Sequence, residues 1–141
     1  MKRFALFLSL ALAVSSCSKD DDTASSQCMF DVVFSAQQFV NGPSDELRIN
    51  HLTVENDCLT IVFSAAGCTG DTWKINLVDS ESSLDTDPAR RSLRLVLKND
   101  ELCEALVRKE VSFDLSILQD HMANSVSLLI VNSNDVVLYE Y

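Results

Sequence analysis

Apolar and polar residues alternate with a period of two along most of the chain beyond residue 28. Such alternation is typical of β-strands that bury one face. The clearest segments have apolar residues at positions 59, 61 and 63, at 73, 75 and 77, at 93, 95 and 97, and at 111, 113 and 115. Apolar runs at Cys28–Phe34, Leu47–Val54, Val126–Val131 and Val136–Tyr141 bring the expected total to about seven or eight strands.

Short polar segments predict the connections between some of these strands. Asn56-Asp57 and Ser133-Asn134 contain residues that tolerate a positive φ, so each predicts a tight hairpin. In the strand from Leu47, the apolar positions change from odd to even across Asn50-His51, which predicts a β-bulge there. The segment 116–124 is a longer connection that has room for one short helical turn.

The composition fits a single all-β domain over residues 28–141. The 141-residue chain is 47% apolar and has only 3 Gly and 2 Pro, which excludes collagen-like and low-complexity classes. A domain of this size buries roughly two-thirds of its unfolded surface, enough for one core. We therefore expect an antiparallel β-sandwich, with a small barrel of the same strands as the alternative.

The first 16 residues have the pattern of a signal peptide. Lys2 and Arg3 precede an apolar run from Phe4 to Val14, and Ser15-Ser16 supply the small residues that cleavage needs. This run is too short to span a bilayer about 30 Å thick as a helix. We therefore expect residues 1–16 to be removed, so that residues 17–27 form a flexible acidic tether ahead of the domain.

The net charge of the chain excludes some classes of binding partner. The formal charge is −10, and Lys2 and Arg3 are the only charged residues in the expected signal peptide. The remaining chain carries 9 basic and 21 acidic side chains, a net charge of −12. Such a polyanion repels phosphate groups, so we expect no nucleic-acid partner and no electrostatic attraction to anionic lipids.

The residues around the expected cleavage point resemble known bacterial signals. Val14-Ser15-Ser16-Cys17 resembles the lipobox of bacterial lipoproteins, which implies that the Cys17 thiol and the new amine carry acyl chains such as palmitate. Several acyl chains hold a protein stably on a membrane, where one chain does not. The lipobox therefore predicts an outer-membrane lipoprotein anchored at Cys17.

A second resemblance indicates on which side of the outer membrane the protein lies. The run from Ser18 through Lys19, Asp20 and Asp21 to Asp22 resembles the export signal of Bacteroidetes surface lipoproteins, which implies an outward-facing protein. If the run is only a solvated tether, the protein faces the periplasm instead. Asp22-Thr23-Ala24 resembles a short O-glycosylation acceptor of the same bacterial group, with Thr23 as the modified residue.

Four cysteines remain once Cys17 is lipidated: Cys28, Cys58, Cys68 and Cys103. An exported chain crosses an oxidising compartment, so we expect two disulfides, for which three connectivities are possible. Zinc is disfavoured because no pair of cysteines has C-x₂-C spacing and both histidines lie far from any cysteine in sequence. We therefore expect no metal at these residues.

Four motifs resemble, in order and spacing, a group of small uncharacterised Bacteroidetes lipoproteins. They are Ala65-Ala66-Gly67-Cys68, Asp87-Pro88-Ala89-Arg90, Leu102-Cys103-Glu104-Ala105 and Val111-Ser112-Phe113-Asp114-Leu115. The match covers roughly residues 47–141 and implies no activity. It implies a disulfide between Cys68 and Cys103, which leaves Cys28 for Cys58.

Candidate catalytic chemistry is sparse. His51 and His121 are the only histidines, and the sequence lacks a G-x-S-x-G nucleophile motif, so we assign no catalytic residue and expect no cofactor. The acidic loop Asp79–Asp87 offers oxygen ligands for calcium but lacks the Gly and terminal Glu of an EF-hand, so a solvated loop is the simpler interpretation. Trp73, Tyr139 and Tyr141 are candidates either for a binding face or for packing.

Two classes of function stay open at this point. The first is a cell-surface binding or adhesion module that presents loops 65–71 and 80–90 to a protein or glycan of unknown identity. The second is a small hydrolase, or an inhibitor of one. An exposed apolar patch favours the first class, and a cleft that joins a histidine to paired carboxylates favours the second.

Overall fold

The computed structural model describes residues 27–44 and 46–141. The expected signal peptide, the lipidation site Cys17, the export signal Ser18–Asp22 and the glycosylation site Thr23 all lie outside the described residues. No helix within the described part of the chain is long and apolar enough to cross a membrane.

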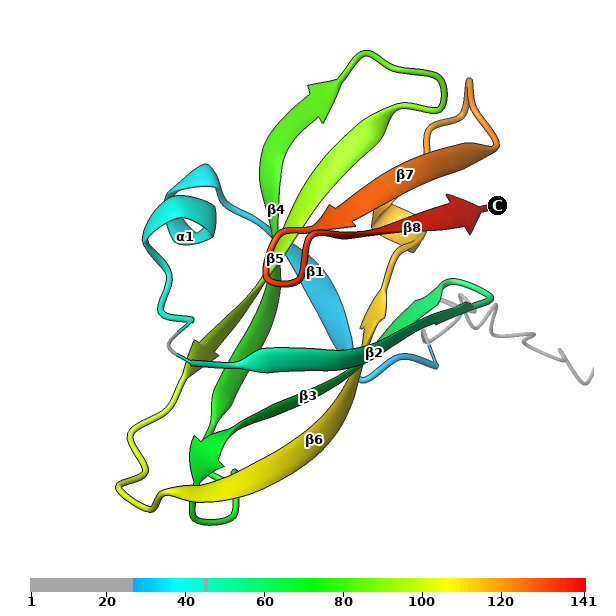
Figure 1. Cartoon of the computed structure of the whole chain (residues 1–141). Coiled ribbons are helices and arrows are strands. Elements are labelled where there is room, and N and C mark those ends of the chain that lie inside the picture. The colour runs from blue at the N-terminus through cyan, green and yellow to red at the C-terminus, as the bar shows by residue number, and fades with distance from the viewer. Residues whose placement is uncertain (1–26, 45) are drawn as a thin grey trace, which may run out of the picture.

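The described residues form an all-β fold, which confirms the expected class (Figure 1). One sheet contains eight strands in the order β2-β3-β6-β1-β4-β5-β7-β8, and it curls into a nearly closed barrel, the alternative to the sandwich. The strands are β1 (Phe30–Phe34), β2 (Arg48–Glu55), β3 (Cys58–Gly67), β4 (Lys74–Leu84), β5 (Arg90–Lys98), β6 (Ala105–Asp114), β7 (Ser125–Ile130) and β8 (Asp135–Glu140). Each of them overlaps a segment that was predicted to be a strand, but β4 continues to Leu84, into the segment 80–90 that was expected to be a loop.

Strand β1 joins the two halves of the sheet. Its first residues, Phe30 and Asp31, pair with the end of β6, and Val32–Phe34 pair with β4. Both pairings are parallel, and so is the pairing of β5 with β7. The sheet therefore differs from the expected antiparallel arrangement in three of its pairings. Alternation shows which face of a strand is buried but carries no information about strand direction, and parallel neighbours need crossovers that local pattern does not reveal.

Inward-facing side chains from all parts of the sheet form the core. In β7 every second residue is buried, as strict alternation requires. The largest fully buried side chains are Tyr139, Phe63, Phe113, Leu59, Ile61, Leu77, Leu93, Leu95, Leu97, Leu115, Leu128 and Ile130. Full burial of one such aliphatic or aromatic side chain contributes about 1.5–3 kcal/mol, so this set supplies most of the driving force for folding.

The turns agree with the sequence. Asn56 and Asn134 have φ angles of 53° and 61°, so both predicted hairpins are present. The register between β2 and β3 shifts between Ile49 and His51, which confirms the predicted bulge. The predicted helical turn in segment 116–124 is a short 3-10 helix, η1 (Ser116–Leu118).

A short helix, α1 (Ala36–Asn41), was not expected from the sequence. The hydroxyl of Ser35 caps it by accepting a hydrogen bond from the backbone N–H of Gln38 at 3.2 Å. Arg94 of β5 donates to the carbonyls of Phe39 and Val40, at 2.6 and 3.0 Å, which holds the last turn against the sheet. Six residues are too few to produce a helical stripe, so periodicity missed this helix.

Candidate binding surface

Two loops meet at one end of the sheet. One connects β3 to β4 and contains Cys68–Trp73, and the other connects β5 to β6 and contains Asn99–Glu104. Figure 1 shows both loops at the lower end of the molecule, beyond the ends of β3 and β6. We call these two loops the clamped end, because several interactions fix one against the other.

The first of these interactions centres on the carboxylate of Glu101. It accepts hydrogen bonds from the backbone N–H groups of Cys68 at 2.6 Å, Thr69 at 3.2 Å and Gly70 at 3.0 Å. The hydroxyl of Thr72 donates a fourth at 2.9 Å. Desolvation raises the pKa of Glu101, but the hydrogen bonds, led by those from Gly70 and Cys68, outweigh it and bring the pKa to about 2. Glu101 is therefore ionised at physiological pH. Its carboxylate binds the backbone N–H groups of the first loop and so fixes that loop in place.

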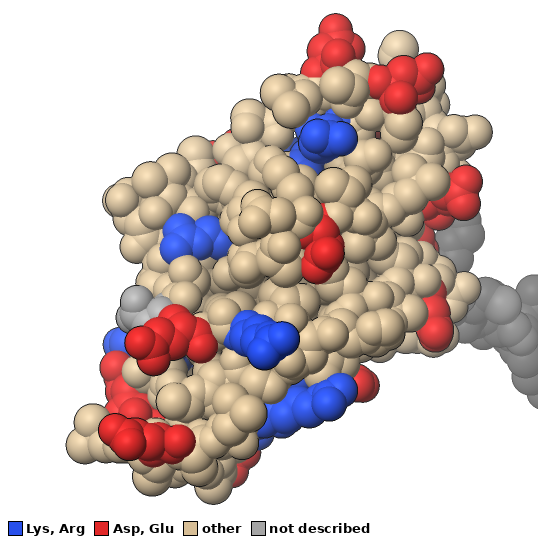
Figure 2. Space-filling model, viewed as in Figure 1, with Lys and Arg blue, Asp and Glu red and all other residues tan. Residues whose placement is uncertain are grey.

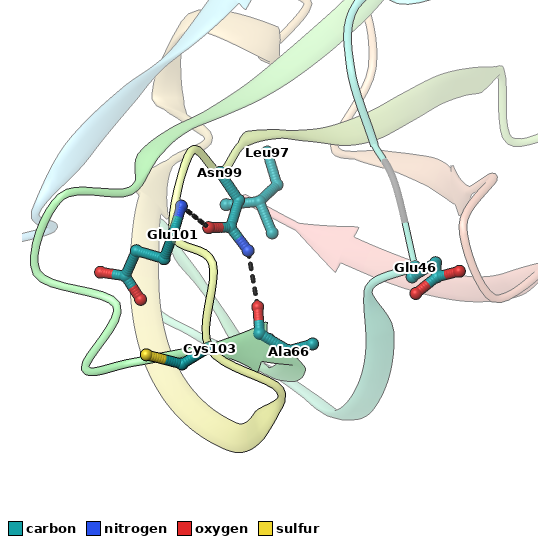
Figure 3. A pocket seen from close by; sticks show the side chains of 6 residues that line it. All are labelled: Glu46, Ala66, Leu97, Asn99, Glu101 and Cys103. Carbon is teal, nitrogen blue, oxygen red and sulfur yellow. Dashed lines mark hydrogen bonds between the residues drawn. The ribbon is translucent and has the colours of Figure 1, made fainter.

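A disulfide crosses between the same loops. Cys68 and Cys103 are bonded, and their Cα atoms are 4.8 Å apart. Next to it, the amide of Asn99 donates to the carbonyl of Ala66 at 2.6 Å and its oxygen accepts from the backbone N–H of Glu101 at 2.9 Å (Figure 3). The second loop is thus fixed at Asn99, Glu101 and Cys103.

The first loop packs against the side chain of Trp73, which lies between the loop and the core. This side chain is only 8% exposed and its ring lies 5.9 Å from the ring of Phe63, so it belongs to the core and not to a binding face. Gly70 has a φ of +73°, and a Cβ added there would lie 3.2 Å from the indole ring. The loop therefore needs glycine at this position, both for the backbone conformation and for the close approach to Trp73.

Leucine side chains project from this rigid frame into solvent. Leu102 is 97% exposed although both of its chain neighbours, Glu101 and Cys103, are fixed to the other loop. Leu106, at the start of β6, is 80% exposed. Leu102 of the clamped end and the adjoining Leu106 thus lie on the outside, and the disulfide and the Glu101 hydrogen bonds hold the backbone beside Leu102 in place.

Charged side chains of both signs lie near the leucines. Asp100 and Glu104 are exposed two residues before and after Leu102. Asp71 pairs with Lys109 at 3.0 Å, and hydrogen bonds from Lys109 and Thr69 lower the pKa of Asp71. Asp100 pairs with Lys98 at 3.4 Å, and Figure 2 shows basic side chains close to the acidic ones at this end of the molecule. Leu102 therefore lies between two exposed acidic residues, of which Asp100 is paired with a lysine.

The clamped end contains a hollow but no deep cleft. The hollow is lined by Glu46, Ala66, Leu97, Asn99, Glu101 and Cys103, and its volume is ≈ 150 Å³ (Figure 3). Small-molecule sites commonly measure about 300–1,000 Å³. The exposed leucines, and not the hollow, are therefore the distinctive feature of this end.

The second loop region expected to bind a partner, residues 80–90, forms the far ends of β4 and β5 and the turn between them. Two acidic side chains at its start have internal partners: Asp79, the residue just before it, is buried and pairs with Arg91 at 2.8 Å, and Glu81 accepts from the backbone N–H of Ala36 at 2.8 Å. The acidic loop from Asp79 to Asp87 is therefore not wholly solvated, contrary to the simpler interpretation of the sequence. Leu84 is 59% exposed at the tip. Among residues 27–44 and 46–141, no group of three or more His, Cys, Asp or Glu is placed to hold a metal ion.

Both histidines lie at the surface of the described structure. His51 is exposed at the bulge of β2, and His121 is exposed in the connection between η1 and β7. Within the described residues, neither side chain forms a hydrogen bond or ion pair, so no triad of Ser, His and Asp is assembled there.

A second disulfide, Cys28–Cys58, fixes the start of the domain to the hairpin between β2 and β3. The structure contains the Cys68–Cys103 pair that the lipoprotein resemblance implied and the Cys28–Cys58 pair that was left by elimination. The tyrosines lie near Cys58: the hydroxyl of Tyr139 donates to Asp57 at 2.5 Å, and the hydroxyl of Tyr141 accepts from the backbone N–H of Asp120 at 2.9 Å. These tyrosines close the end of the sheet opposite the clamped end and do not form a binding face.

Sequence reasoning pointed to the loop around Cys68 but missed Glu101 and Leu102. The resemblance drew attention to Leu102-Cys103, yet nothing in the sequence shows that the carboxylate of Glu101 reaches across 31 to 33 residues to the backbone of the other loop. The usable signal was the acidic residue two positions before a cysteine that was expected to form a disulfide.

Comparison with known proteins shows a shared fold but does not establish a function. No family model matches the sequence, and no curated protein matches it significantly. A solved structure of a protein of unknown function from Bacteroides vulgatus is 19% identical, with a TM-score of 0.54 over 79% of this chain and 55% of that one. A putative toxin-related protein from Parabacteroides distasonis is 18% identical, with a TM-score of 0.54 over 81% of this chain and 61% of that one.

A third similar structure is a NigD-like immunity protein from Bacteroides caccae, 9% identical, with a TM-score of 0.54 over 78% of this chain and 59% of that one. The chain thus spans only about 55–61% of the lengths of these three proteins. Identities this low show a shared fold alone.

Proposed function

We propose that this protein is a lipid-anchored binding module of the outer membrane that faces the exterior and binds a protein partner through its clamped end. The anchor and the outward orientation rest on the residues from Val14 to Asp22 in the sequence. The similar structures contribute only the fold.

The observation that carries the proposal is the exposure of Leu102. A large apolar side chain that is 97% exposed on a flexible loop loses conformational entropy when a partner binds it. Here the disulfide at Cys103 and the hydrogen bonds to Glu101 have already ordered the backbone on both sides. A fixed apolar side chain that fills a partner's pocket has the properties of an interface hot spot.

The chemistry of this surface favours a protein over a glycan. Leu102 and Leu106 offer apolar contact without the hydrogen-bonding groups or aromatic faces that sugar hydroxyls and rings need. Leucine in an apolar pocket is a typical protein contact, and Glu104 beside it matches a basic group at the rim of such a pocket. A binding function of this kind requires no catalytic residue, and none is assigned in this chain.

Site-specific photo-crosslinking in intact cells tests the proposal. A benzophenone amino acid replaces Leu102 in the full-length chain, and the matched control places it at Leu84, an exposed leucine at the opposite end of β4. We expect one discrete crosslinked protein from position 102, lost when Leu106→Asp is added, and no such product from position 84. Equal products from both positions, or none from position 102, would contradict the proposal.

The anchor is tested separately. Cys17→Ala should give a precursor that is not labelled with palmitate and leaves the membrane fraction, because the acylated thiol is missing. Replacement of Lys19, Asp20 and Asp21 by Ala should keep the lipid but protect the domain from protease added to whole cells. A Cys17→Ala variant that still fractionates with the membrane would rule out lipidation at this residue.

A further inference from the structure

The sheet has two unpaired edges that face each other. Strand β2 pairs with β3, and β8 pairs with β7, and within the described residues no strand pairing links β2 to β8. Figure 1 shows β2 and β8 on neighbouring sides of the molecule with a gap between them. Strand pairing is therefore continuous around the barrel except between β2 and β8.

The hydrogen-bonding pattern of β8 shows which backbone groups are free at this edge. The backbone N–H of Tyr141 donates to the carbonyl of Asn124 at 3.0 Å, which makes Asn124 and Tyr141 a hydrogen-bonded pair. Hydrogen-bonded pairs alternate along an antiparallel ladder, so Val137 and Tyr139 also bond to β7. The N–H and C=O groups of Val136 and Leu138 therefore point away from β7, towards the unpaired edge.

The directions of the two edge strands are also informative. The successive pairings from β2 to β8 include three parallel and four antiparallel steps, so β2 and β8 run in the same direction. The arrows of both strands point the same way in Figure 1. A single added strand that is antiparallel to β8 is consequently antiparallel to β2 as well.

A groove lies between these edges. It is lined by Ile49, Asn50, His51, Leu52, Asp135 and Val137, and its volume is ≈ 290 Å³. Ile49 and Leu52 also pack against the hydrophobic core, so the groove has an apolar part beside its polar lining residues. The carboxylate of Asp135 is at the rim, and within residues 27–44 and 46–141 it has no ion-pair partner.

The groove is closed at one end and open at the other. At the closed end, the hydroxyl of Tyr139 donates to Asp57, in the turn after β2, and Gln119 donates to both residues. The open end lies at the beginnings of β2 and β8, around Ile49 and Asp135. A segment that enters the groove therefore pairs with the first half of β8 only.

We propose that this opening receives a short extended segment of a partner protein, which pairs through its backbone with Val136 and Leu138 of β8. One apolar side chain of the segment contacts Ile49, Leu52 and Val137, and a basic side chain lies against Asp135. The basic character follows from Asp135 and from the net charge of −12 beyond the expected signal peptide. This mode of recognition draws affinity from main-chain hydrogen bonds at an exposed edge and specificity from alternate side chains. It is independent of the clamped end.

The test uses a phage library of random nonapeptides selected on the full-length protein in detergent. We expect selected peptides to alternate apolar and polar residues and to carry Lys or Arg. Val136→Pro removes a donor that points to the free edge and leaves the ladder to β7 intact, so it should weaken binding at least tenfold. Val136→Thr, which keeps the N–H and the β-branched shape, is the matched control and should bind as the unaltered protein does.

A second measurement leaves the protein unaltered, so that misfolding of the proline variant cannot decide the outcome. Two versions of one selected peptide are N-methylated on alternate amides, each on one edge of the extended chain. One version should lose binding and the other should retain it, and bound peptide should protect the amides of Val136 and Leu138 from hydrogen exchange. Asp135→Lys should shift selection towards acidic peptides. Failure to enrich any peptide, or equal binding by both methylated versions, would overturn the proposal.

Discussion

The carboxylate of Asp79 forms two hydrogen bonds with the guanidinium of Arg91, at 2.8 and 2.9 Å, where β4 and β5 lose their regular register. Asp79 is completely buried, and the backbone N–H of Glu81 donates to it at 2.7 Å. The guanidinium carbon of Arg91 lies 5.4 Å from the centre of the Phe34 ring, so the same ion pair also contacts β1. The pair thus joins three strands at the irregular part of the sheet.

We expect Arg91→Met to destabilise the domain by about 3–5 kcal/mol, because it leaves the buried carboxylate of Asp79 without its counter-charge. Urea unfolding followed by circular dichroism measures the loss. The double variant Asp79→Asn with Arg91→Met removes both charges and should cost less than the two single changes added together. Additive losses would show that the two side chains do not depend on each other.

The Glu101 carboxylate gives a prediction about acid stability. Its pKa in the folded state, about 2, is below its ordinary value of 4.5. A lowered pKa contributes stability that is present above pH 4.5 and is lost as the pH falls from 4.5 to 2. Glu101→Gln should therefore lower the melting temperature at neutral pH and flatten its fall across this window. The neighbouring change Glu104→Gln is the control, and a wild-type profile for Glu101→Gln would contradict the role of the clamp.

The strands were predictable from the sequence because a sheet with one buried face imposes alternation on each strand separately. Val126, Leu128 and Ile130 show this plainly, since each is buried and each lies between less buried neighbours. The bulge at His51 was equally visible, because one extra residue reverses the phase of the apolar positions. These features depend only on residues near each other in the chain.

The features that were not predictable depend on residues distant in the chain. Parallel pairing of β5 with β7 places Leu93 beside Ile130, across the whole of β6 and η1, and no local pattern records it. The Glu101 hydrogen bonds are of the same kind, since three of the four donating residues use the backbone N–H, which every residue except proline possesses. The exposure of Leu102 was also hidden, because the sequence shows an apolar residue but not which way it faces.

Gly70 allows a direct test of the geometry of the clamped end. Gly70→Ala should destabilise the domain by about 1–2 kcal/mol, because an L-residue at a φ of +73° is strained and its Cβ would lie 3.2 Å from the buried ring of Trp73. Chemical denaturation measures the change. Asn134→Gly, at a positive-φ position in an exposed hairpin, should change stability little. If Gly70→Ala is neutral, the loop does not have the conformation described.

Tyr139 predicts a loss of stability at alkaline pH. Burial and the hydrogen bond to Asp57 raise its pKa to about 12, against an opposing effect of Gln119. A raised pKa keeps the proton on the folded protein, so this contribution is present below pH 10 and is lost as the pH rises from 10 to 12. Tyr139→Phe should reduce stability by about 1–2 kcal/mol at neutral pH and remove this part of the alkaline loss. Thermal melts across the alkaline range provide the measurement, and Tyr141→Phe is the matched control.

The two disulfides should contribute similar amounts to stability. They join residues 30 and 35 positions apart, and the chain-entropy relation gives about 3.5–4 kcal/mol for loops of either length. Paired Cys→Ser replacement at Cys28 and Cys58, or at Cys68 and Cys103, should therefore lower the free energy of unfolding by comparable amounts. Only the second pair should also reduce crosslinking from position 102, because only that disulfide fixes the backbone beside Leu102. Unfolding in urea and the intact-cell crosslink separate the two effects. A Cys28 and Cys58 variant that stays folded but loses the crosslink would show that binding does not depend on the clamped end alone.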